Sequence, residues 1–265
     1  MAHTSALINV MIGAARKAAR GLSRDFGEIG KLQIAKKGAS DFVSAADLRA
    51  EETLFQELSK ARPKYGFLME ERGAIDGSDN SNRWIVDPLD GTTNFLHGLP
   101  QFAVSICLER DRQPFAGVIY NPAMDELFWA EKGQGAWLND SRLRVSAQGS
   151  LAETLFATGL PFRGRSGRPK AMKETERVLS ETAGIRRFGS ASLDLAYTAA
   201  GRFDAFWEWG LNAWDVGAGI VLVREAGGVV GTVEEVNGDP LHGPSILAAN
   251  GEIFESARSL ITGKS

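Results

Sequence analysis

Cysteine is nearly missing from this sequence, and the single one, Cys107, lies inside the apolar run Phe102–Leu108. One thiol cannot form an internal disulfide, so a small fold held together by disulfides is excluded. A lone thiol in an apolar strand is typical of a protein in a reducing compartment. We therefore expect a cytoplasmic location.

Long apolar runs and long basic runs are also missing. No apolar stretch reaches the roughly 18 residues that span a bilayer, so no transmembrane helix is predicted. Lysine and arginine number 30 against 33 acidic residues, and the net charge is −3. Without a long basic run, direct nucleic-acid binding is not expected. The chain does have ample apolar residues, 43% of 265, for one large domain or two closely packed halves.

The N-terminal segment lacks the apolar core of a signal peptide. It carries basic residues and few acids between Arg16 and Arg24, a composition that transit peptides share. Its apolar residues recur at helical spacing over residues 5–26, which favours a long structural helix over a targeting segment. A short strand near Leu32–Ala35 and a solvated turn at Lys36–Gly38 are expected to follow.

A second helix is predicted after Asp41–Asp47, ending near Ala61 because Pro63 stops it. Ser44 and Asp47 have the spacing of a capping box, which indicates that Asp47 caps this helix. On spacing alone, Asp47 therefore has a structural role.

Two acids come directly after a short apolar strand at Tyr65–Met69. Glu70 and Glu71 would repel each other at the end of a buried strand unless water or a cation surrounds them. We therefore expect at least one of them to point into a cleft. A polar loop is predicted next, over residues 73–82.

The stretch from Trp84 to Phe95, WIVDPLDGTTNF, is the most informative part of the chain. It begins as a buried strand, which Pro88 is expected to end because proline has no backbone N–H. Carboxylates such as Asp87 and Asp90 bind hard cations, and the first N–H groups of a helix bind anions. The stretch thus predicts a place where cations are held against a phosphate. Asp-x-x-Asp by itself is equally typical of a capped turn.

Short β-rich segments dominate the middle of the chain, and the polar turns between them favour an antiparallel meander. The predicted strands are 102–109, 114–120, 126–131 and 136–138. The composition changes near Ser146–Leu151, which divides the chain into halves 1–146 and 147–265. The first half is expected to carry most of the candidate metal ligands, and the second to contribute Glu208 and Asp215.

Strands and helices alternate in the second half. The predicted strands are 155–158, 185–188, 203–207, 229–230 and 246–249, and the predicted helices are 169–182, 192–200, 214–225 and 253–261. With the first half, this pattern indicates an α/β (α+β) layered sandwich of alternating helix and sheet layers. Asp215 opens a nearly all-apolar helix, where the helix dipole favours an acid, and Glu208 ends a strand. Neither residue is informative alone.

Taken together, the motifs resemble those of the inositol monophosphatase family. They are MEER at 69–72, DPLDGTTNF at 87–95, and WD at 214–215 at the head of a helix that ends in EAGG at 225–228. The family belongs to a superfamily of metal-dependent, lithium-sensitive sugar phosphatases that includes fructose-1,6-bisphosphatase. The resemblance extends from about Asp41 to Gly228 and implies the layered fold of that superfamily.

The resemblance implies two or three Mg²⁺ ions. Glu70, Asp87 and the Leu89 carbonyl match the ligands of a first ion, while Asp87, Asp90 and Asp215 match those of a second. Asp87 would therefore bridge the two. A third, weaker ion is expected near Glu70.

The resemblance also implies catalytic and binding roles. Thr92 is expected to orient the attacking water with Asp47 as its carboxylate partner, and Glu70 completes the catalytic set. The expected substrate contacts are Leu89, Asp90, Gly91, Thr92, Thr93, Arg186, Ala191, Glu208 and Asp215. Arg186 or Arg187 is expected to bind substrate or to lie at a subunit interface, and Lys36 matches a family position close to the site.

The resemblance favours hydrolysis of myo-inositol 1-phosphate and related polyol phosphates, because Thr93–Phe95 has the form found in that family. A related phosphatase acting on fructose 1,6-bisphosphate, histidinol phosphate or a nucleotide 3′-phosphate stays open. So does a non-enzymatic role as a protein-binding module, since some bacterial relatives take part in assembling transcription complexes. A homodimer is expected by family likeness. Trp129, Trp137 and Trp207 are candidates either for its interface or for the core.

Overall fold

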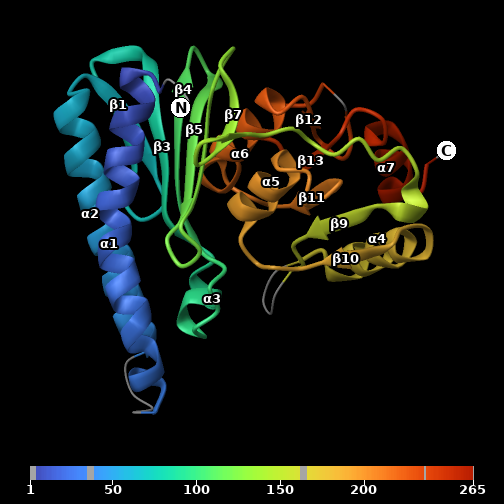
Figure 1. Cartoon of the computed structure of the whole chain (residues 1–265), viewed down its shortest axis with the longest axis horizontal. Helices are drawn as coiled ribbons and strands as arrows, with labels where there is room; N and C mark the ends of the chain where they lie inside the picture. The colour runs from blue at the N-terminus through green and yellow to red at the C-terminus, as the bar shows by residue number, and fades with distance from the viewer. Residues whose placement is uncertain (1–3, 35–38, 162–165, 236, 265) are drawn as a thin grey trace.

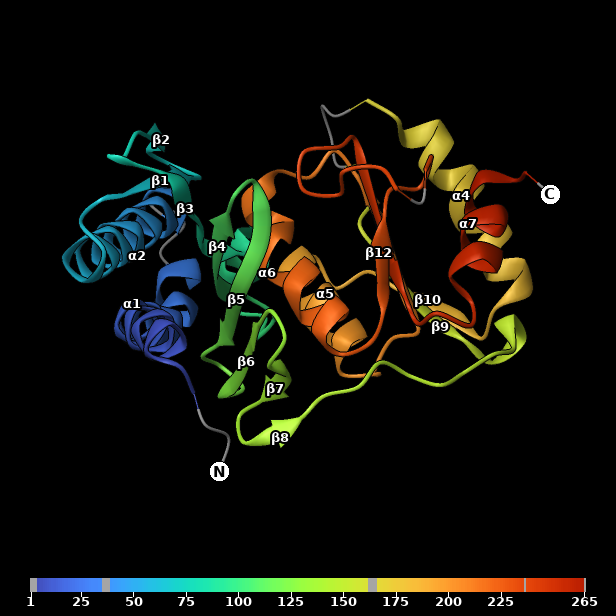
Figure 2. The same cartoon turned by 90° about the horizontal axis from the view of Figure 1, so that it is seen from above.

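The chain folds into alternating layers of helix and sheet, as the computed structural model in Figure 1 and Figure 2 shows. The structure describes residues 4–34, 39–161, 166–235 and 237–264, with the backbone alone over 29–34 and 39–44. The layers are, in order, α1 (Ala6–Ile34) with α2 (Ala39–Ala61), a first sheet, α5 (Ala191–Ala199) with α6 (Ala213–Glu225), a second sheet, and α4 (Arg168–Glu181) with α7 (Phe254–Thr262). This order confirms the predicted layered sandwich.

The first sheet has eight strands in the order β2-β1-β3-β4-β5-β6-β7-β8. Their bounds are β1 Tyr65–Met69, β2 Gly73–Ile75, β3 Asp79–Asp90, β4 Ala103–Arg110, β5 Gln113–Asn121, β6 Glu126–Glu131, β7 Gly135–Leu138 and β8 Ser141–Arg142. From β3 to β8, consecutive strands pair antiparallel, which confirms the predicted meander. β1 is different, because it runs parallel to β3.

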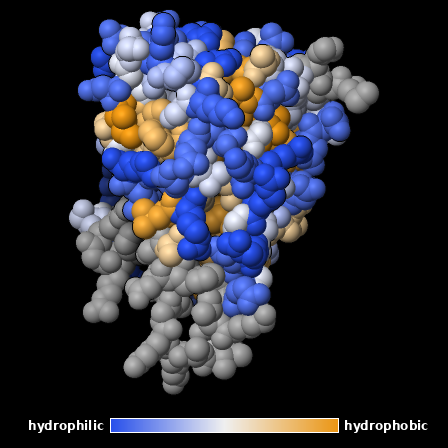
Figure 3. Space-filling model, turned by 90° about the vertical axis from the view of Figure 1, so that its left-hand side faces the viewer, coloured by the Kyte–Doolittle hydropathy of each residue, from blue (hydrophilic) through white to orange (hydrophobic). Residues whose placement is uncertain are grey.

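Helices α1 and α2 cover the outer face of the first sheet. The apolar spacing that predicted the first helix places Ile8, Met11 and Leu22 toward the sheet, where they are fully buried. Figure 3 shows the molecule from the side of these helices, where the surface is mostly hydrophilic with scattered hydrophobic side chains. Within the described ranges, none of the helices combines the length and the apolar character that crossing a membrane requires.

Three expectations about the first hundred residues are wrong. Leu32–Ile34 continue α1 as helix instead of forming a strand, and Ala35 lies outside the described residues together with Lys36–Gly38. Helix α2 begins at Ala39, so Asp47 lies two turns inside it and cannot be its N-cap. Residues 73–82 are not one loop, because β2 folds back on β1 and β3 already begins at residue 79.

Helix α6 lies between the two sheets (Figure 2) and packs on both. Its central residues, Val216–Val223, are apolar on all sides because both faces of the helix are buried there. Its approach to β5 is so close that a Cβ at Gly117 would lie 2.6 Å from the Ala218 carbonyl oxygen. The core around it joins Cys107 of the first sheet to Phe206 and Ile246 of the second.

The second sheet has five strands in the order β10-β9-β11-β13-β12. Their bounds are β9 Leu155–Thr158, β10 Gly184–Arg186, β11 Ala205–Trp209, β12 Val229–Gly231 and β13 Ser245–Ala249. Every helix and strand predicted for this half is present, with ends shifted by a few residues. β10 ends at Arg186, short of the predicted Phe188, because the chain turns at Gly189 (φ +82°) toward α5.

The tryptophans proposed for an interface are largely core residues. Trp129 and Trp207 are 3% and 2% exposed, and each belongs to a buried apolar cluster. Trp137 is half-buried and stacks on Trp129, with ring centroids 5.5 Å apart. Trp129 and Trp207 are therefore core residues, whereas Trp137 remains partly accessible.

Candidate active site

The acids predicted as metal ligands lie where β1 and β3 end beside each other. The two strands are parallel and Met69 pairs with Val86, so the residues that follow, Glu70 and Asp87, lie side by side. The Glu70 N–H donates to the Val86 carbonyl at 3.3 Å. This register is the reason why two motifs separated in sequence supply one site.

An irregularity in β3 follows Asp87. The strand does not end at Pro88 as predicted, but its pairing with β4 is interrupted between Asp87 and Asp90. Proline cannot donate a ladder hydrogen bond, and the next N–H, that of Leu89, donates to Asp87 Oδ1 at 2.9 Å. The interruption leaves Asp90 close enough for its charge to oppose the ionisation of Asp87.

Gly91 turns the chain from β3 into the short helix α3 (Thr92–Leu96). Its φ is +88°, and a Cβ there would lie 2.7 Å from the Gln101 carbonyl oxygen, so both conformation and space require glycine. Thr92 Oγ1 donates to the Leu89 carbonyl at 3.0 Å. The threonine hydroxyl is thereby fixed next to the carbonyl predicted as a metal ligand.

The buried residues of α3 anchor it in both halves of the chain. The Phe95 ring is fully buried, with its centroid 4.9 Å from that of Phe102. Asn94 Nδ2 donates to the Gln101 carbonyl at 2.7 Å and to the Phe188 carbonyl at 2.8 Å. Because Phe188 precedes α5, Asn94 ties the WIVDPLDGTTNF stretch to the second half.

Helix α2 adds two buried acids at the edge of the site, Asp47 and Glu51, which lie four residues apart on one helix face. Glu51 accepts the Glu71 N–H at 2.9 Å and the Arg72 Nε–H at 3.2 Å, and so holds the turn after Glu70. Asp47 Oδ1 is buried and has no hydrogen-bond partner among the described residues.

Asp90 receives its hydrogen bonds from the start of α5. The Ser190 hydroxyl donates to Asp90 Oδ2 at 2.6 Å and the Ser192 N–H at 2.8 Å, and the Ser192 hydroxyl donates to the same oxygen. Ser190 is the N-cap of α5, so the first N–H groups of this helix point at the carboxylate. Ala191 contributes a further backbone hydrogen bond.

Asp215 lies in the first turn of α6, where the sequence predicted it. Its Oδ2 accepts the Asn212 N–H at 2.6 Å, as half of a capping box with that residue. Its charge also contributes to raising the pKa of Asp87. Asp215 therefore both caps α6 and lies close to the other acids.

Glu208 lies in β11 with its carboxylate directly over the backbone of Gly159. A Cβ at Gly159 would lie 1.9 Å from Glu208 Oε1, so any other residue would displace the carboxylate. The Glu208 charge adds to burial in raising the pKa of Asp194 on α5 well above its ordinary value. The absence of a side chain at Gly159 thus leaves the space that the Glu208 carboxylate occupies.

Asp47, Glu70, Asp87, Asp90 and Asp215 are called the acid cluster below. Burial, followed by the charges of Asp90, Glu70 and Asp215, raises the pKa of Asp87 well above its ordinary value. Burial is also the largest cause of the raised pKa values of Glu70 and Asp90. Burial and the neighbouring glutamates raise the pKa of Asp47 to about 8. Carboxylates in this situation are stabilised by protons or by cations.

The donor set of the acid cluster is entirely oxygen, which is what Mg²⁺ prefers. Within the described ranges, no three His, Cys, Asp or Glu side chains converge closely enough to form a metal cage as they stand. The raised pKa values and the unpartnered Asp47 Oδ1 nevertheless show that added positive charge would stabilise the site. The residues therefore fit divalent cations, provided that binding draws the carboxylates together.

The other predicted contacts differ in how near they lie to the acid cluster. Thr93 is exposed at the start of α3. Arg186 donates from Nη1 to the carbonyl of its own neighbour, Ile185, and no hydrogen bond or ion pair among the described residues joins it to the cluster. Arg187 is better placed, because its charge is close enough to Asp194 to oppose the rise in pKa that burial and Glu208 cause there. Lys36 lies outside the described residues.

Several residues that shape the site were not predicted. Glu51 could have been found from its four-residue spacing to Asp47 on one helix face. Ser190 and Ser192 stand at a predicted helix start, which is a signal for hydrogen bonding but does not indicate Asp90 as the acceptor. Gly159 carries no sequence signal for its contact with Glu208.

Comparisons with known proteins give the same picture. The family model described as the inositol monophosphatase family matches residues 3–262. The inositol-1-monophosphatase of Mesorhizobium japonicum is 58% identical over 253 residues, which cover 96% of this chain and 94% of that protein. The Nus factor SuhB of Escherichia coli K12 is 42% identical over 84% of each chain. The crystal structure of extragenic suppressor protein suhB from Bartonella henselae matches with a TM-score of 0.89 at 52% identity, covering 97% of this chain and 98% of that one. Because the family match spans almost the whole sequence and the motifs meet at one site, the chain belongs to the inositol monophosphatase family.

Proposed function

We propose that this protein hydrolyses inositol monophosphate, such as myo-inositol 1-phosphate and related polyol phosphates, to the free polyol and phosphate in a Mg²⁺-dependent reaction. As a family member the chain is a phosphoric monoester hydrolase. The observation that carries the proposal is the convergence of Glu70, Asp87 and Asp215 from three separate elements at one end of the first sheet. The substrate class rests on the likeness to inositol-1-monophosphatases.

The acid cluster is proposed to hold two or three Mg²⁺ ions. Glu70, Asp87 and the Leu89 carbonyl would hold the first, Asp87, Asp90 and Asp215 the second, and a third, weaker ion would lie near Glu70. Bound Mg²⁺ supplies neutralisation of the phosphate charge and a lowered pKa for a water molecule. The hydrogen bonds from Ser190 and Ser192 keep Asp90 oriented for this role.

Thr92, Asp47 and Glu70 are the proposed catalytic residues of the chain itself. The Thr92 hydroxyl donates to the Leu89 carbonyl, so its lone pairs remain to accept a hydrogen bond from the attacking water. Asp47 is its carboxylate partner, with a buried Oδ1 that has no partner within the described residues. Glu70 lies at the open rim of the site, where water reaches the residue although the surrounding protein still desolvates its carboxylate and raises its pKa.

The substrate would lie between the start of α3 and the second half of the chain. The backbone at Gly91, Thr92 and Thr93 is proposed to bind the phosphate oxygens. Glu208 and the backbone at Ala191 are proposed to receive sugar hydroxyls, while Leu89, Asp90 and Asp215 contact the substrate through the ions. Arg186 is retained as a proposed contact, with Arg187 as the better-placed neighbour.

The test is phosphate release from inositol 1-phosphate, fructose 1,6-bisphosphate, histidinol phosphate and adenosine 3′,5′-bisphosphate. Each is assayed with Mg²⁺, with EDTA, and with Mg²⁺ plus Li⁺. We expect release that requires Mg²⁺, is inhibited by Li⁺ and is fastest with inositol 1-phosphate. A preference for another compound would keep the site and change the substrate, whereas no release from any of them by folded, Mg²⁺-bound protein would refute the proposal.

A second candidate is a protein-binding role in transcription complexes, favoured by the likeness to a relative named Nus factor SuhB. Asp87→Asn separates the two functions, because it removes a central carboxylate and adds no bulk. If a deletion strain regains its growth phenotype from the Asp87→Asn chain as fully as from the wild type, the phenotype depends on binding. If only the wild type restores it, the phenotype depends on hydrolysis.

We also propose a cytoplasmic homodimer whose subunits consist of halves 1–146 and 147–265. Family likeness supports the dimer, and the single buried thiol, Cys107, supports the location. Light scattering coupled to size exclusion tests the dimer directly. A mass of one chain at micromolar concentration would contradict it.

A further inference from the structure

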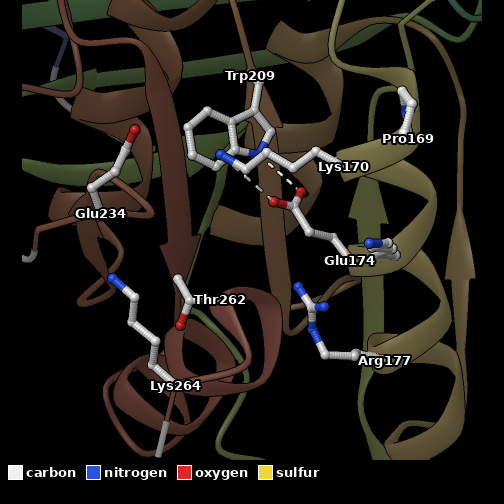
Figure 4. Close-up of a pocket in the computed structure, with 9 residues that line it drawn as sticks. Pro169, Lys170, Glu174, Arg177, Trp209, Glu234, Thr262 and Lys264 are labelled. Atoms are coloured by element: carbon white, nitrogen blue, oxygen red, sulfur yellow. Dashed lines mark hydrogen bonds and ion pairs between the residues drawn. The ribbon is translucent and has the colours of Figure 1, made fainter.

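A cavity lies away from the acid cluster, on the outer side of the second sheet between α4 and α7, with a volume of about 430 Å³ (Figure 4). Four basic side chains line it, Lys170, Lys173, Arg177 and Lys264, together with two acids, Glu174 and Glu234. Its charged side chains therefore carry a surplus of two positive charges. The proposed function makes no use of this cavity.

On one side of the cavity, the polar side chains pair with one another. Trp209 Nε1 donates to Glu174 Oε2 at 2.9 Å, and the Glu174 side chain is almost fully buried. Lys170 Nζ lies 3.1 Å from the centroid of the Trp209 ring and 4.0 Å from Glu174 Oε1. Figure 4 shows these three side chains drawn together. Lys170 and Glu174 thus largely neutralise each other.

The remaining cations are differently placed. Arg177 Nε donates to the Leu260 carbonyl at 3.0 Å, and an Nη atom donates to the Ile261 carbonyl, so the guanidinium is fixed at the end of α7. A guanidinium has five N–H donors, which leaves Arg177 further donors for a ligand. Lys173 and Lys264 are exposed, and neither forms an ion pair with any carboxylate among the described residues.

The cavity is separate from the acid cluster. Trp209 packs with Trp207 against the buried residues of the outer layer, whereas Phe206 belongs to the core around α6. Since neighbouring strand residues point to opposite faces, Glu208 and Trp209 lie on opposite sides of the second sheet. An anion bound beside Trp209 would therefore be distinct from a substrate phosphate.

We propose that the cavity between α4 and α7 binds a small anion with two linked phosphate groups. Its volume is in the range of small-molecule sites. Arg177 presents the planar, oriented donors that suit one phosphate group, while Lys173 on α4 and Lys264 after α7 supply flexible point charges that can reach the other. Glu174 and Trp209 form an adjoining wall of the cavity, and their polar groups are already hydrogen-bonded to each other.

The test is isothermal titration of the full-length protein with inorganic pyrophosphate in EDTA and about 0.1 M salt, a screening condition in which weak surface attraction is reduced. EDTA keeps Mg²⁺ from the acid cluster, whose negative charge then repels pyrophosphate. We expect saturable binding at one site per chain. Orthophosphate should bind at least tenfold more weakly, because it has a single phosphate group and therefore less charge and fewer acceptor oxygens for these cations.

The decisive variant is Lys173→Gln with Lys264→Gln, and the matched control is Lys60→Gln with Lys132→Gln, which removes two exposed lysines elsewhere. We expect at least tenfold weaker binding for the first pair, since charge-assisted hydrogen bonds are lost, and less than a twofold change for the second. Three results would each overturn the proposal. They are equal effects of the two pairs of substitutions, no saturable binding of pyrophosphate by the wild type, and binding of orthophosphate as tight as that of pyrophosphate. Melting curves of both variants verify folding, and hydrolysis is not part of the readout.

Discussion

The acid cluster collects negative charges that are mostly buried, whereas the cavity between α4 and α7 collects positive charges that are mostly exposed. Asp87 is almost fully buried, and burial together with neighbouring acids raises its pKa. Lys173 on α4 and Lys264 just after the end of α7 are exposed, and water solvates their charges. A buried group of like charges depends on a counter-ion for its stability, whereas an exposed group attracts one without depending on it. Ligands should thus change the stability of the first site much more than that of the second.

The largest effect is expected from exchanging one buried acid in each region for its amide. Asp87→Asn should reduce hydrolysis about a thousandfold or more, since charge stabilisation by bound metal is worth several kcal/mol and each tenfold corresponds to about 1.4 kcal/mol. Glu174→Gln should leave the rate within about twofold. Steady-state phosphate release measures both. Similar losses in the two variants would remove the distinction between the regions.

Mg²⁺ should stabilise the protein through the acid cluster alone. At a hundredfold excess over its Kd, a ligand of the folded state adds about 2.7 kcal/mol, which is roughly 5–10 °C in melting temperature for a chain of this size. The Lys173→Gln/Lys264→Gln variant should show the same shift, and Asp87→Asn little or none. Differential scanning fluorimetry with increasing Mg²⁺ measures it, and an undiminished shift in Asp87→Asn would place the ions elsewhere.

Without metal, the stability of the protein should fall as the pH rises. The pKa of Asp47 is about 8 in the folded state and about 3.8 ordinarily, so between these values the folded state binds more protons than the unfolded state. Its contribution is complete below about pH 4 and lost as the pH passes 8. We expect roughly 2 kcal/mol of loss between pH 5 and 8, less than the full shift implies, because water and local relaxation reduce the cost of burial.

Urea unfolding in EDTA at several pH values measures this slope. Asp47→Asn should reduce this slope, since the amide does not titrate while Glu70, Asp87 and Asp90 still do, and saturating Mg²⁺ should reduce it further in the wild type. A slope unchanged by Asp47→Asn would assign the pH dependence to other groups.

The smallest effect concerns the acid of the basic cavity. Glu174→Gln keeps an acceptor for Trp209 Nε1, so we expect the free energy of unfolding to change by less than about 1 kcal/mol. Glu174→Ala should cost about 1–3 kcal/mol, because it leaves the indole N–H without its partner. Urea unfolding at pH 7 compares the two, and a larger loss for the glutamine variant would mean that the charge itself is required.

The sequence was most informative where a motif is local. The apolar run before Asp87 predicted a strand and the Gly-Thr-Thr-Asn segment predicted a helix start, and the structure contains both. Pro88 was expected to end the strand, whereas it only interrupts the pairing with β4. Only the end of the strand was misjudged, since β3 resumes its pairing at Asp90.

Contacts between distant segments could not be predicted from one sequence. The hydrogen bonds from Ser190 and Ser192 to Asp90 cross about a hundred residues and depend on how the halves pack. The contact of Glu208 with Gly159 likewise depends on the pairing of β11 with β9. The helical position of Asp47 was missed because α2 begins eight residues before it, ahead of any capping signal at Ser44.

The position of α6 between the sheets has a consequence for synthesis on the ribosome. The first sheet is complete at Arg142, yet α6, the helix that makes most of the contacts with its inner face, begins only at Ala213. At 5–20 residues per second, translation takes roughly 4–14 s to bridge those seventy or so residues. Throughout that interval the nascent chain presents the apolar side of a nearly finished sheet, and Asp215 has not yet been made. We therefore expect the nascent chain to be more prone to aggregation during this interval than the finished protein is.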